Sequence, residues 1–348
     1  MSEKDGEIIP RQACTEIEVH GMPNESGIGY ADYVLFDTNG IPLAVVEAKR
    51  TSEDAAKGRH QAELYADCLA SKYACPRPVI YYSNGFDTNI IDGIGYPSRQ
   101  VMGFHTLDEL RRLILQRGRN DITDLTISDK ITNRNYQKRV IESVCRHYND
   151  KHRRALLVMA TGTGKTRVSI SLVDVLVRNN WIKNVLFLAD RIELVNQAKK
   201  NYTKLLPNMT VSSLRESDVD ISARILFSTY QTMIGHLDKD NKTFSLGRFD
   251  LIIIDEAHRS VFGKYGAIFD YFDGLLLGLT ATPRDEVDRS TYELFGMEQG
   301  EPTDSYEYDE AVADGYLNPF VPIKDNSLIL TEGIDPEKLT DEERKQIQ

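Results

Sequence analysis

Residues 155–166 decide the fold, and they read Ala-Leu-Leu-Val-Met-Ala-Thr-Gly-Thr-Gly-Lys-Thr. The apolar run Ala155–Met159 predicts a short buried strand. A small, glycine-containing loop follows, and residues 167–173 after it, Arg-Val-Ser-Ile-Ser-Leu-Val, have a helical pattern. The order of strand, tight loop and helix start predicts an anion site at the N-terminus of a helix.

The loop has the composition of a phosphate-binding P-loop. Its glycines let backbone N–H groups close around phosphates, Lys165 supplies a positive charge and Thr166 a hydroxyl for Mg2+. Met159 departs from the usual pattern, which has glycine six residues before the lysine. A plain Gly/Thr turn is the alternative interpretation of this loop taken alone. We expect the nucleotide to be held by Thr161, Gly162, Thr163, Gly164, Lys165 and Thr166.

A second polar motif follows an apolar run further along the chain. Residues 249–258 read Phe-Asp-Leu-Ile-Ile-Ile-Asp-Glu-Ala-His, and four consecutive apolar residues predict a fully buried parallel strand. We expect Asp255 to hold Mg2+ through water and Glu256 to take a proton from the water that attacks the γ-phosphate. His258 would couple that event to the DNA-binding side. Two such motifs, each after an apolar strand, favour an ATP site over chance.

Strands and helices alternate between these two motifs, over residues 184–191, 192–205 and 225–231. Such alternation predicts a parallel sheet, whose ligands lie at the C-terminal ends of the strands. Small polar side chains at those ends suit the sugar-phosphate backbone of DNA. Local capping of the strands is an alternative of nearly equal weight. The candidate DNA contacts are Asp190, Arg191, Ser228, Thr229 and Gln231.

Two further elements resemble superfamily 2 helicases. Arg134, Tyr136 and Gln137 are similar to the R-x-Y-Q element with which many of these helicases hold adenine. In that resemblance the glutamine reads the base edge and the arginine or tyrosine stacks on the base. Thr280 and Thr282, in Thr-Ala-Thr, resemble the motif that links hydrolysis to DNA movement. Together with the P-loop and the Asp-Glu-Ala-His motif, they imply the first RecA-like lobe of a DEAH-type motor.

The N-terminal third contains two strand-like runs that meet at Asn39-Gly40, the strongest short signal for a hairpin. If these two residues form the turn, Asp32 lies directly opposite Glu47, and Lys49 shares their face. Opposed carboxylates destabilise a sheet unless a charge neutralises them, and a divalent cation bound by carboxylate oxygens does so. The alternative is a pair of exposed acids that the lysine screens.

Asp32 with Glu47-Ala-Lys49 resembles the D...ExK core of restriction-endonuclease-like nucleases. In such a site the ion polarises a phosphodiester and activates a water, which Lys49 orients. Gln61 and Tyr65 lie at helical i, i+4 spacing and resemble the QxxxY element of type I restriction enzymes. These nucleases usually have a helix before the Asp-bearing strand. The short lead with Gly and Pro leaves open whether that helix is present here.

Composition sets broad limits on the whole chain. Its 348 residues are 41% hydrophobic and 27% charged, which suits about two soluble domains. A net charge of -11 argues against non-specific coating of nucleic acid but allows local basic clefts. The four cysteines show no CxxC or paired metal spacing, so we expect neither zinc nor a disulfide. Without an apolar signal core or membrane-length run, we expect a cytoplasmic protein without membrane contact.

Taken together, the motifs resemble the restriction (R) subunit of type I restriction-modification enzymes. The resemblance implies an α/β chain with a nuclease domain at 1–127, a RecA-like lobe at 128–322, and a linker or second-lobe start at 323–348. Its cofactors would be ATP and Mg2+, and its substrate double-stranded DNA. Methyltransferase and specificity subunits would be its partners. Such an enzyme pumps DNA with ATP and cuts unmodified DNA away from the recognition site.

Two alternatives remain open from the sequence. One alternative to the type I subunit is a stand-alone DNA-repair helicase-nuclease, and the other is a truncated DNA-binding remnant without motor activity. The second RecA-like lobe, whose arginines complete the ATP site of such motors, has no motif before Gln348. We therefore expect a fragment of a longer subunit that does not translocate by itself. The acidic residues 335–348 predict a solvated helix or linker.

Overall fold

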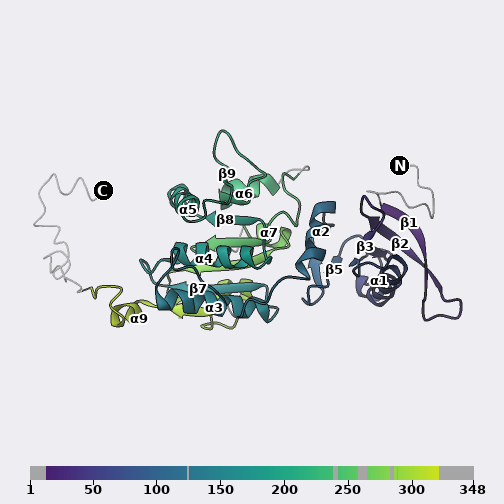
Figure 1. The fold of residues 1–348 in the computed structure, drawn as a ribbon, viewed down its shortest axis with the longest axis horizontal. Helices are drawn as coiled ribbons and strands as arrows, with labels where there is room; N and C mark the ends of the chain where they lie inside the picture. The colour runs from purple at the N-terminus through teal and green to yellow at the C-terminus, as the bar shows by residue number, and fades with distance from the viewer. Residues whose placement is uncertain are drawn as a thin grey trace, which may run out of the picture.

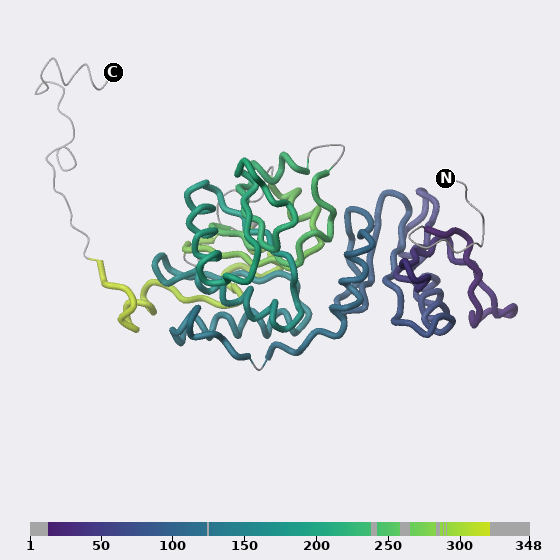
Figure 2. The backbone as a smooth tube through the Cα atoms, turned by 45° about the horizontal axis from the view of Figure 1, so that its top comes forward, coloured from purple at the N-terminus to yellow at the C-terminus, as the bar shows by residue number. Residues whose placement is uncertain are grey.

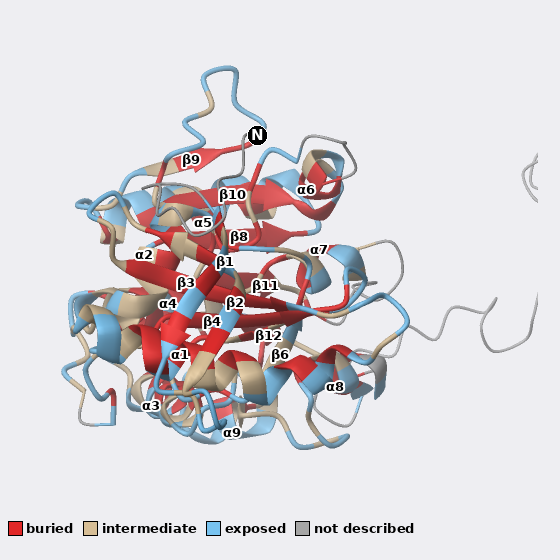
Figure 3. Ribbon diagram, turned by 90° about the vertical axis from the view of Figure 1, so that its right-hand side faces the viewer, coloured by how far each residue is buried: buried red, intermediate tan, exposed pale blue. Residues whose placement is uncertain are grey.

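The computed structural model describes residues 13–123, 125–237, 242–257, 265–282, 286–287 and 289–320. The molecule contains two β-sheets, and helix α2 (Leu107–Gln116) lies between them (Figures 1 and 2). The central strands of both sheets are buried, whereas the edge strands are partly exposed (Figure 3). Within the described residues no helix has both the length and the apolar character to cross a membrane. The predicted linker or second-lobe start at 323–348, with its solvated helix or linker at 335–348, lies outside the described residues.

The N-terminal sheet has six strands in sequence order, and its central pair β3 and β4 is parallel while the other pairs are antiparallel. Helix α1 packs its residues Ala62, Tyr65 and Leu69 on one side, and Leu110 of α2 packs with the opposite cluster. The strands are β1 (Ala13–His20), β2 (Ile28–Phe36), β3 (Pro42–Ala48), β4 (Val79–Ser83), β5 (Thr88–Ile91) and β6 (Arg99–Val101). The helices are η1 (Ala55–Gly58), α1 (Arg59–Tyr73) and α2 (Leu107–Gln116).

The β2–β3 hairpin has the predicted register but not the predicted turn. Tyr33 pairs with Val46, as a turn at Asn39-Gly40 requires. However, only Gly40 of these two residues has positive φ, so the predicted two-residue turn is wrong. The turn is longer, with Gly40 N–H donating to the Asp37 carbonyl at 3.0 Å. A register shift between Leu35 and Phe36 restores the pairing that the shorter turn would give.

The second sheet has seven strands in the order β13-β7-β12-β11-β8-β10-β9, all parallel, which confirms the predicted parallel sheet. One apolar cluster joins it to α3, α4 and α5, and a second to α6, α7 and α8. The strands are β7 (Arg154–Met159), β8 (Val185–Ala189), β9 (Val211–Ser213), β10 (Ile225–Thr229), β11 (Leu251–Asp255), β12 (Leu275–Thr280) and β13 (Asp304–Tyr306). The helices are α3 (Asn135–Asn149), α4 (Lys165–Arg178), α5 (Ile192–Leu205), α6 (Tyr230–Leu237), α7 (Gly266–Tyr271), α8 (Arg289–Phe295) and α9 (Tyr308–Ala313).

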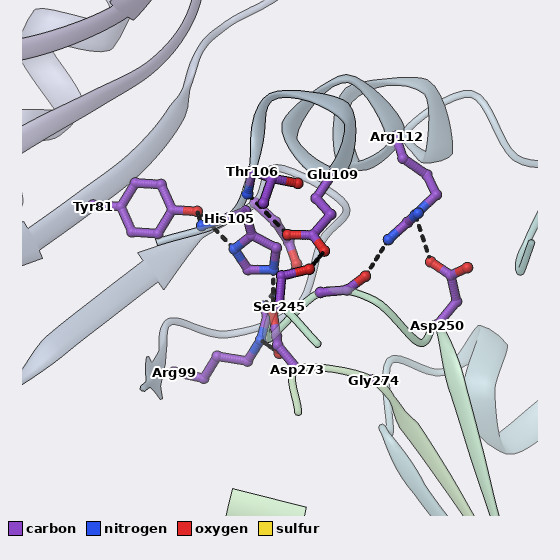
Figure 4. A network of polar contacts seen from close by, with 12 residues as sticks. Tyr81, Arg99, His105, Thr106, Glu109, Arg112, Ser245, Asp250, Asp273 and Gly274 are labelled. Carbon is purple, nitrogen blue, oxygen red and sulfur yellow. Dashed lines mark hydrogen bonds and ion pairs between the residues drawn. The ribbon is translucent and has the colours of Figure 1, made fainter. Parts of the chain in front are cut away.

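A buried carboxylate joins the two sheets. Asp273, just before β12, receives two hydrogen bonds of 2.7 Å from Arg99 of β6 and one of 2.7 Å from Arg153, which precedes β7. His105 Nε2 lies 3.3 Å from the same carboxylate (Figure 4). Burial alone would raise the pKa of Asp273, but the charges of Arg153 and Arg99 outweigh it and hold this pKa well below 3.8. The carboxylate is therefore ionised across the physiological pH range.

Helix α2 adds a second set of contacts to this joint. Arg112 forms an ion pair of 2.8 Å with Asp250, the residue that precedes β11. Gln116 donates to the same carboxylate at 3.1 Å, and Ser245 donates to Glu109 (Figure 4). The other Asp250 oxygen accepts the backbone N–H groups of residues 183 and 184 at 2.9 and 2.8 Å. Asp250 therefore ties α2 to the segment that leads into β8.

We expect Asp273→Asn to destabilise the chain by about 3–5 kcal/mol, because it removes the buried counter-charge of Arg153 and one of the two carboxylates that pair with Arg99, the other being Asp92. The free energy of unfolding in urea measures the effect. Asp270→Asn is the matched control, since Asp270 is exposed on α7 three residues earlier. Equal stability of the two variants would contradict a structural role for the Asp273 carboxylate.

Candidate functional site

Strands β2 and β3 of the N-terminal sheet and the helix α1 bring the predicted nuclease residues together. Lys49, just after β3, donates to Glu47 Oε1 at 2.7 Å and to Gln61 Oε1 of α1 at 3.0 Å. Gln61 in turn donates to the Tyr65 hydroxyl at 2.6 Å. Asp32 of β2 accepts the backbone N–H of Ala48 at 2.7 Å, so its carboxylate reaches the end of β3. All five predicted residues therefore lie in one continuous cluster.

Glu47 is the least solvated member of this cluster. Its side chain is 2% exposed, and its Oε2 atom has no hydrogen-bond partner among the described residues. Burial raises the pKa of Glu47, Lys49 opposes that rise, and the nearby charge of Asp32 adds to it. The hydrogen bond to Glu47 raises the pKa of Lys49, so the lysine stays charged.

The cluster fits a divalent cation by its oxygen donors. A free carboxylate oxygen of Glu47 and the Asp32 carboxylate are hard ligands of the kind that Mg2+ takes. The described residues contain no group of three or more His, Cys, Asp or Glu side chains arranged around a metal. A cation held by Asp32 and Glu47 would have two protein carboxylates as ligands, and Mg2+ commonly keeps several waters in such sites.

Gly58 is a residue of this site that the sequence did not single out. A Cβ atom on Gly58 would lie 2.9 Å from Glu47 Cγ and 3.4 Å from Lys49 Cε. Glycine at the start of α1 therefore permits the helix to approach the two catalytic candidates closely. The sequence does offer one signal for this role. A glycine stands three residues before Gln61, at the N-cap of the helix, where a capping side chain is more usual.

The P-loop has the predicted conformation. β7 ends at Met159 and α4 begins at Lys165, while Gly162 and Gly164 have φ of 86° and 94°, which favour glycine. Met159 is fully buried as the last residue of the strand, so its departure from the usual pattern lies outside the loop. Lys165 Nζ lies 3.4 Å from the Met159 carbonyl. Burial lowers the pKa of Lys165, against the opposing charges of Glu256 and Asp255.

Asp255 and Glu256 lie at the end of β11, beside Lys165. Burial, and then the charge of Glu256, raise the pKa of Asp255 to about 6, and Lys165 opposes this rise. Glu256 has φ of 57°, a left-handed conformation that non-glycine residues seldom adopt. Backbone strain of this kind is concentrated at functional sites. Thr166 is partly exposed in the first turn of α4.

The predicted adenine residues contact the P-loop itself. Tyr136 donates to the Thr163 carbonyl at 2.6 Å, and Gln137 donates to the same carbonyl at 2.8 Å. Gln137 is buried, and its other end accepts the Thr132 hydroxyl. The ring of Tyr136 is stacked on Tyr306 with centroids 3.8 Å apart. Both side chains thus hold the loop, an orientation that differs from the expected contact with a base.

The predicted DNA and coupling residues differ in their exposure to solvent. Asp190, Arg191 and Gln231 are exposed, but Gln231 lies in α6, so its predicted position at a strand end is wrong. Ser228 and Thr229 are buried and make local hydrogen bonds, to the Thr229 carbonyl at 2.9 Å and to the Thr232 hydroxyl at 3.0 Å. Such local hydrogen bonds are what the alternative interpretation, capping of the strand end, expects. Thr280 is buried and accepts the Thr282 N–H at 3.2 Å. His258 lies outside the described residues.

Comparison with known proteins gives matches in chain order. Residues 12–99 match the N terminus of the type I restriction enzyme R protein, and residues 130–285 match the res subunit of type III restriction enzymes. The type I restriction enzyme EcoAI endonuclease subunit of Escherichia coli is 31% identical over 330 residues, covering 88% of this chain and 39% of that subunit. The type I restriction enzyme EcoKI endonuclease subunit of Escherichia coli strain K12 is 26% identical over 370 residues, which cover 85% of this chain and 31% of that subunit.

The chain spans less than two fifths of the length of these relatives. The Asp32–Glu47–Lys49 cluster and the first five strands of the mixed sheet fall within the first matched region. The P-loop and Asp255 fall within the second. The order of the two matches is the order of the two sheets. In its matched regions and in the order of its two sheets, the chain is similar to the restriction (R) subunits of type I restriction enzymes.

Proposed function

We propose that this chain is part of an ATP-dependent DNA translocase and endonuclease subunit of a type I restriction-modification complex. Such a subunit cuts unmodified double-stranded DNA away from the recognition site and works with methyltransferase and specificity subunits. The observation that carries the nuclease assignment is the unpartnered, buried Glu47 Oε2 beside Asp32 and Lys49. A polar atom in that position is costly unless a ligand satisfies it.

In this proposal residues 1–127 are the nuclease domain. Asp32 and Glu47 would hold Mg2+, which, when bound, supplies polarisation of the phosphodiester and activation of a water. Lys49 stays charged through its contact with Glu47 and is positioned by Gln61. That ammonium group would orient the attacking water or stabilise negative charge on the phosphate. Tyr65 would keep the Gln61 amide in the orientation that presents its oxygen to Lys49.

Residues 128–322 would be the first RecA-like lobe of the motor. The backbone N–H groups of residues 161–166 and Lys165 would bind the phosphates of ATP, and Thr166 and Asp255 would hold its Mg2+. Glu256 would accept the proton of the attacking water. Thr280 and Thr282 are proposed to link hydrolysis to DNA movement, with DNA contacts from exposed strand-end residues such as Arg191.

We expect Lys49→Ala to abolish Mg2+-dependent DNA cleavage while leaving the fold intact, because Lys49 is partly exposed and lies at the rim of the cluster. Cleavage of a supercoiled plasmid with and without Mg2+ measures the loss, and circular dichroism checks the fold. Lys57→Ala is the matched control, since Lys57 is an exposed lysine of the neighbouring η1. Unchanged cleavage by Lys49→Ala would remove the nuclease assignment from this hairpin.

For the motor, we expect these 348 residues to bind ATP weakly and not to turn it over steadily, since the arginines of a second RecA-like lobe complete such sites. Phosphate release with and without DNA is the measurement. A longer protein that carries the second lobe is the positive control, and its Lys165→Ala variant sets the background. Turnover by the 348 residues at the rate of the longer protein would contradict this division of the site.

The raised pKa of Asp255 gives a pH-dependent prediction. The folded chain binds the Asp255 proton more tightly than the unfolded chain does. The contribution of this group to the free energy of unfolding is therefore fully present below pH 3.8 and is lost as pH rises through about 6. A pKa change from 3.8 to about 6 corresponds to about 3 kcal/mol. Without Mg2+, Asp255→Asn should therefore be about 3 kcal/mol more stable than the unmodified chain at pH 8, and about 1 kcal/mol more stable at pH 4.5.

Urea unfolding at both pH values in EDTA measures this difference. Asp190→Asn is the control, because Asp190 is exposed at the end of the neighbouring strand β8. Equal stability of Asp255→Asn and the unmodified chain at pH 8 would contradict the prediction. It would mean that burying the ionised Asp255 carboxylate does not destabilise the fold, so no cation would be needed to compensate for it.

A further inference from the structure

The segment 304–318, here called the strap, lies against the P-loop. It comprises β13, α9 and the turn after them, and it follows the region matched by the motor family model. Tyr306 pairs with Met159, and the Ala160 N–H donates to the Tyr306 carbonyl at 2.9 Å. Leu317 lies 3.3 Å from the place of a Cβ atom on Gly162. The described chain thus ends beside β7 and α3, at the end of the molecule remote from the N-terminal sheet (Figures 1 and 2).

Two of the three residues predicted to hold a nucleotide base already have their polar groups and ring faces in contact with other parts of the protein. One face of the Tyr136 ring is covered by Tyr306 at an interplanar angle of 6°, and its hydroxyl donates to Thr163. Gln137 is 2% exposed, and both ends of its amide are hydrogen-bonded. Neither side chain offers a free face or edge to a purine.

Arg134 and Tyr316 are the groups that remain available in this region. Arg134 is partly exposed, and its guanidinium lies 5.0 Å from the centre of the Tyr316 ring. Tyr316 is 42% exposed and meets Tyr136 edge-on, with centroids 4.9 Å apart. An aromatic ring and a guanidinium that face each other form the two walls that stack on a flat base.

We propose that Tyr316 of the strap is the base-stacking residue of the nucleotide site, with Arg134 on the opposite side of the base. This inference rests on the proposed ATP-binding function of the P-loop. Insertion of a purine needs two stacking distances of about 3.5 Å, so ring and guanidinium must separate by about 2 Å. The flexible Arg134 side chain supplies that movement.

The same residues connect the base to the phosphates. Arg134 donates to the Tyr136 hydroxyl at 2.9 Å, and that hydroxyl donates to the Thr163 carbonyl of the P-loop at 2.6 Å. The strap does not cover the loop, because a cavity of about 350 Å³ remains between Thr161, Ala281 and Leu317. In this inference the triphosphate enters the P-loop from the side of this cavity while its base lies against Tyr316.

Competition binding separates a base contact from a phosphate contact. Fluorescent N-methylanthraniloyl-ATP is bound to the chain and displaced by unlabelled ATP or by inorganic tripolyphosphate, which lacks a base. Tyr316→Leu keeps much of the side-chain volume without an aromatic face, and Tyr316→Phe keeps the face without the hydroxyl. We expect Tyr316→Leu to weaken ATP about ten-fold and to leave tripolyphosphate unchanged. Tyr316→Phe should bind ATP within about two-fold of the unmodified chain.

Two results would overturn the inference: equal ATP binding by Tyr316→Leu and the unmodified chain, or an equal loss of ATP and tripolyphosphate binding. The second result would mean that the substitution disturbs the loop. Lys165→Ala tests the function on which the inference rests. If the unmodified chain and Lys165→Ala bind tripolyphosphate equally, the P-loop assignment itself fails, whatever the Tyr316 variants do.

Discussion

The buried carboxylate of Asp273 is the constraint on which the arrangement of the two sheets depends. It lies between Arg99 of the N-terminal sheet and Arg153, which leads into β7. Buried charges persist only when they are paired, so the three groups fix one another. β7 ends at the P-loop and β12, which follows Asp273, ends at Thr280. The edge of the N-terminal sheet is therefore anchored beside two of the strands that carry the predicted motor motifs.

Both candidate sites contain a carboxylate that the fold holds in an unfavourable place. Burial raises the pKa of Glu47 and that of Asp255, and in each case a lysine only partly opposes the effect. Each carboxylate also has a second acid beside it, Asp32 in one site and Glu256 in the other. A cation would relieve both the burial and the repulsion. The two sites thus apply one electrostatic principle in a mixed sheet and in a parallel sheet.

Local patterns in the sequence were sufficient for most of the fold. Uninterrupted apolar runs predicted the parallel strands β7, β8, β10 and β11, and the α5 range was predicted at 192–205 as observed. The nuclease cluster followed from one hairpin register and one helical spacing. The two-residue turn was wrong because a compensating register shift has no sequence signal. The strands β1, β5, β9 and β13 were not predicted. Asp273 could not be found, because its partners lie 174 and 120 residues away along the chain.

The most direct test of two cation-dependent sites in one chain is a crystal structure with Mn2+ and a non-hydrolysable ATP analogue, analysed by anomalous scattering. The account predicts one anomalous peak between Asp32 and Glu47 and another beside Thr166 and Asp255. Absence of the first peak at saturating Mn2+ would contradict the nuclease site. A nucleotide bound away from residues 161–166 would contradict the motor site.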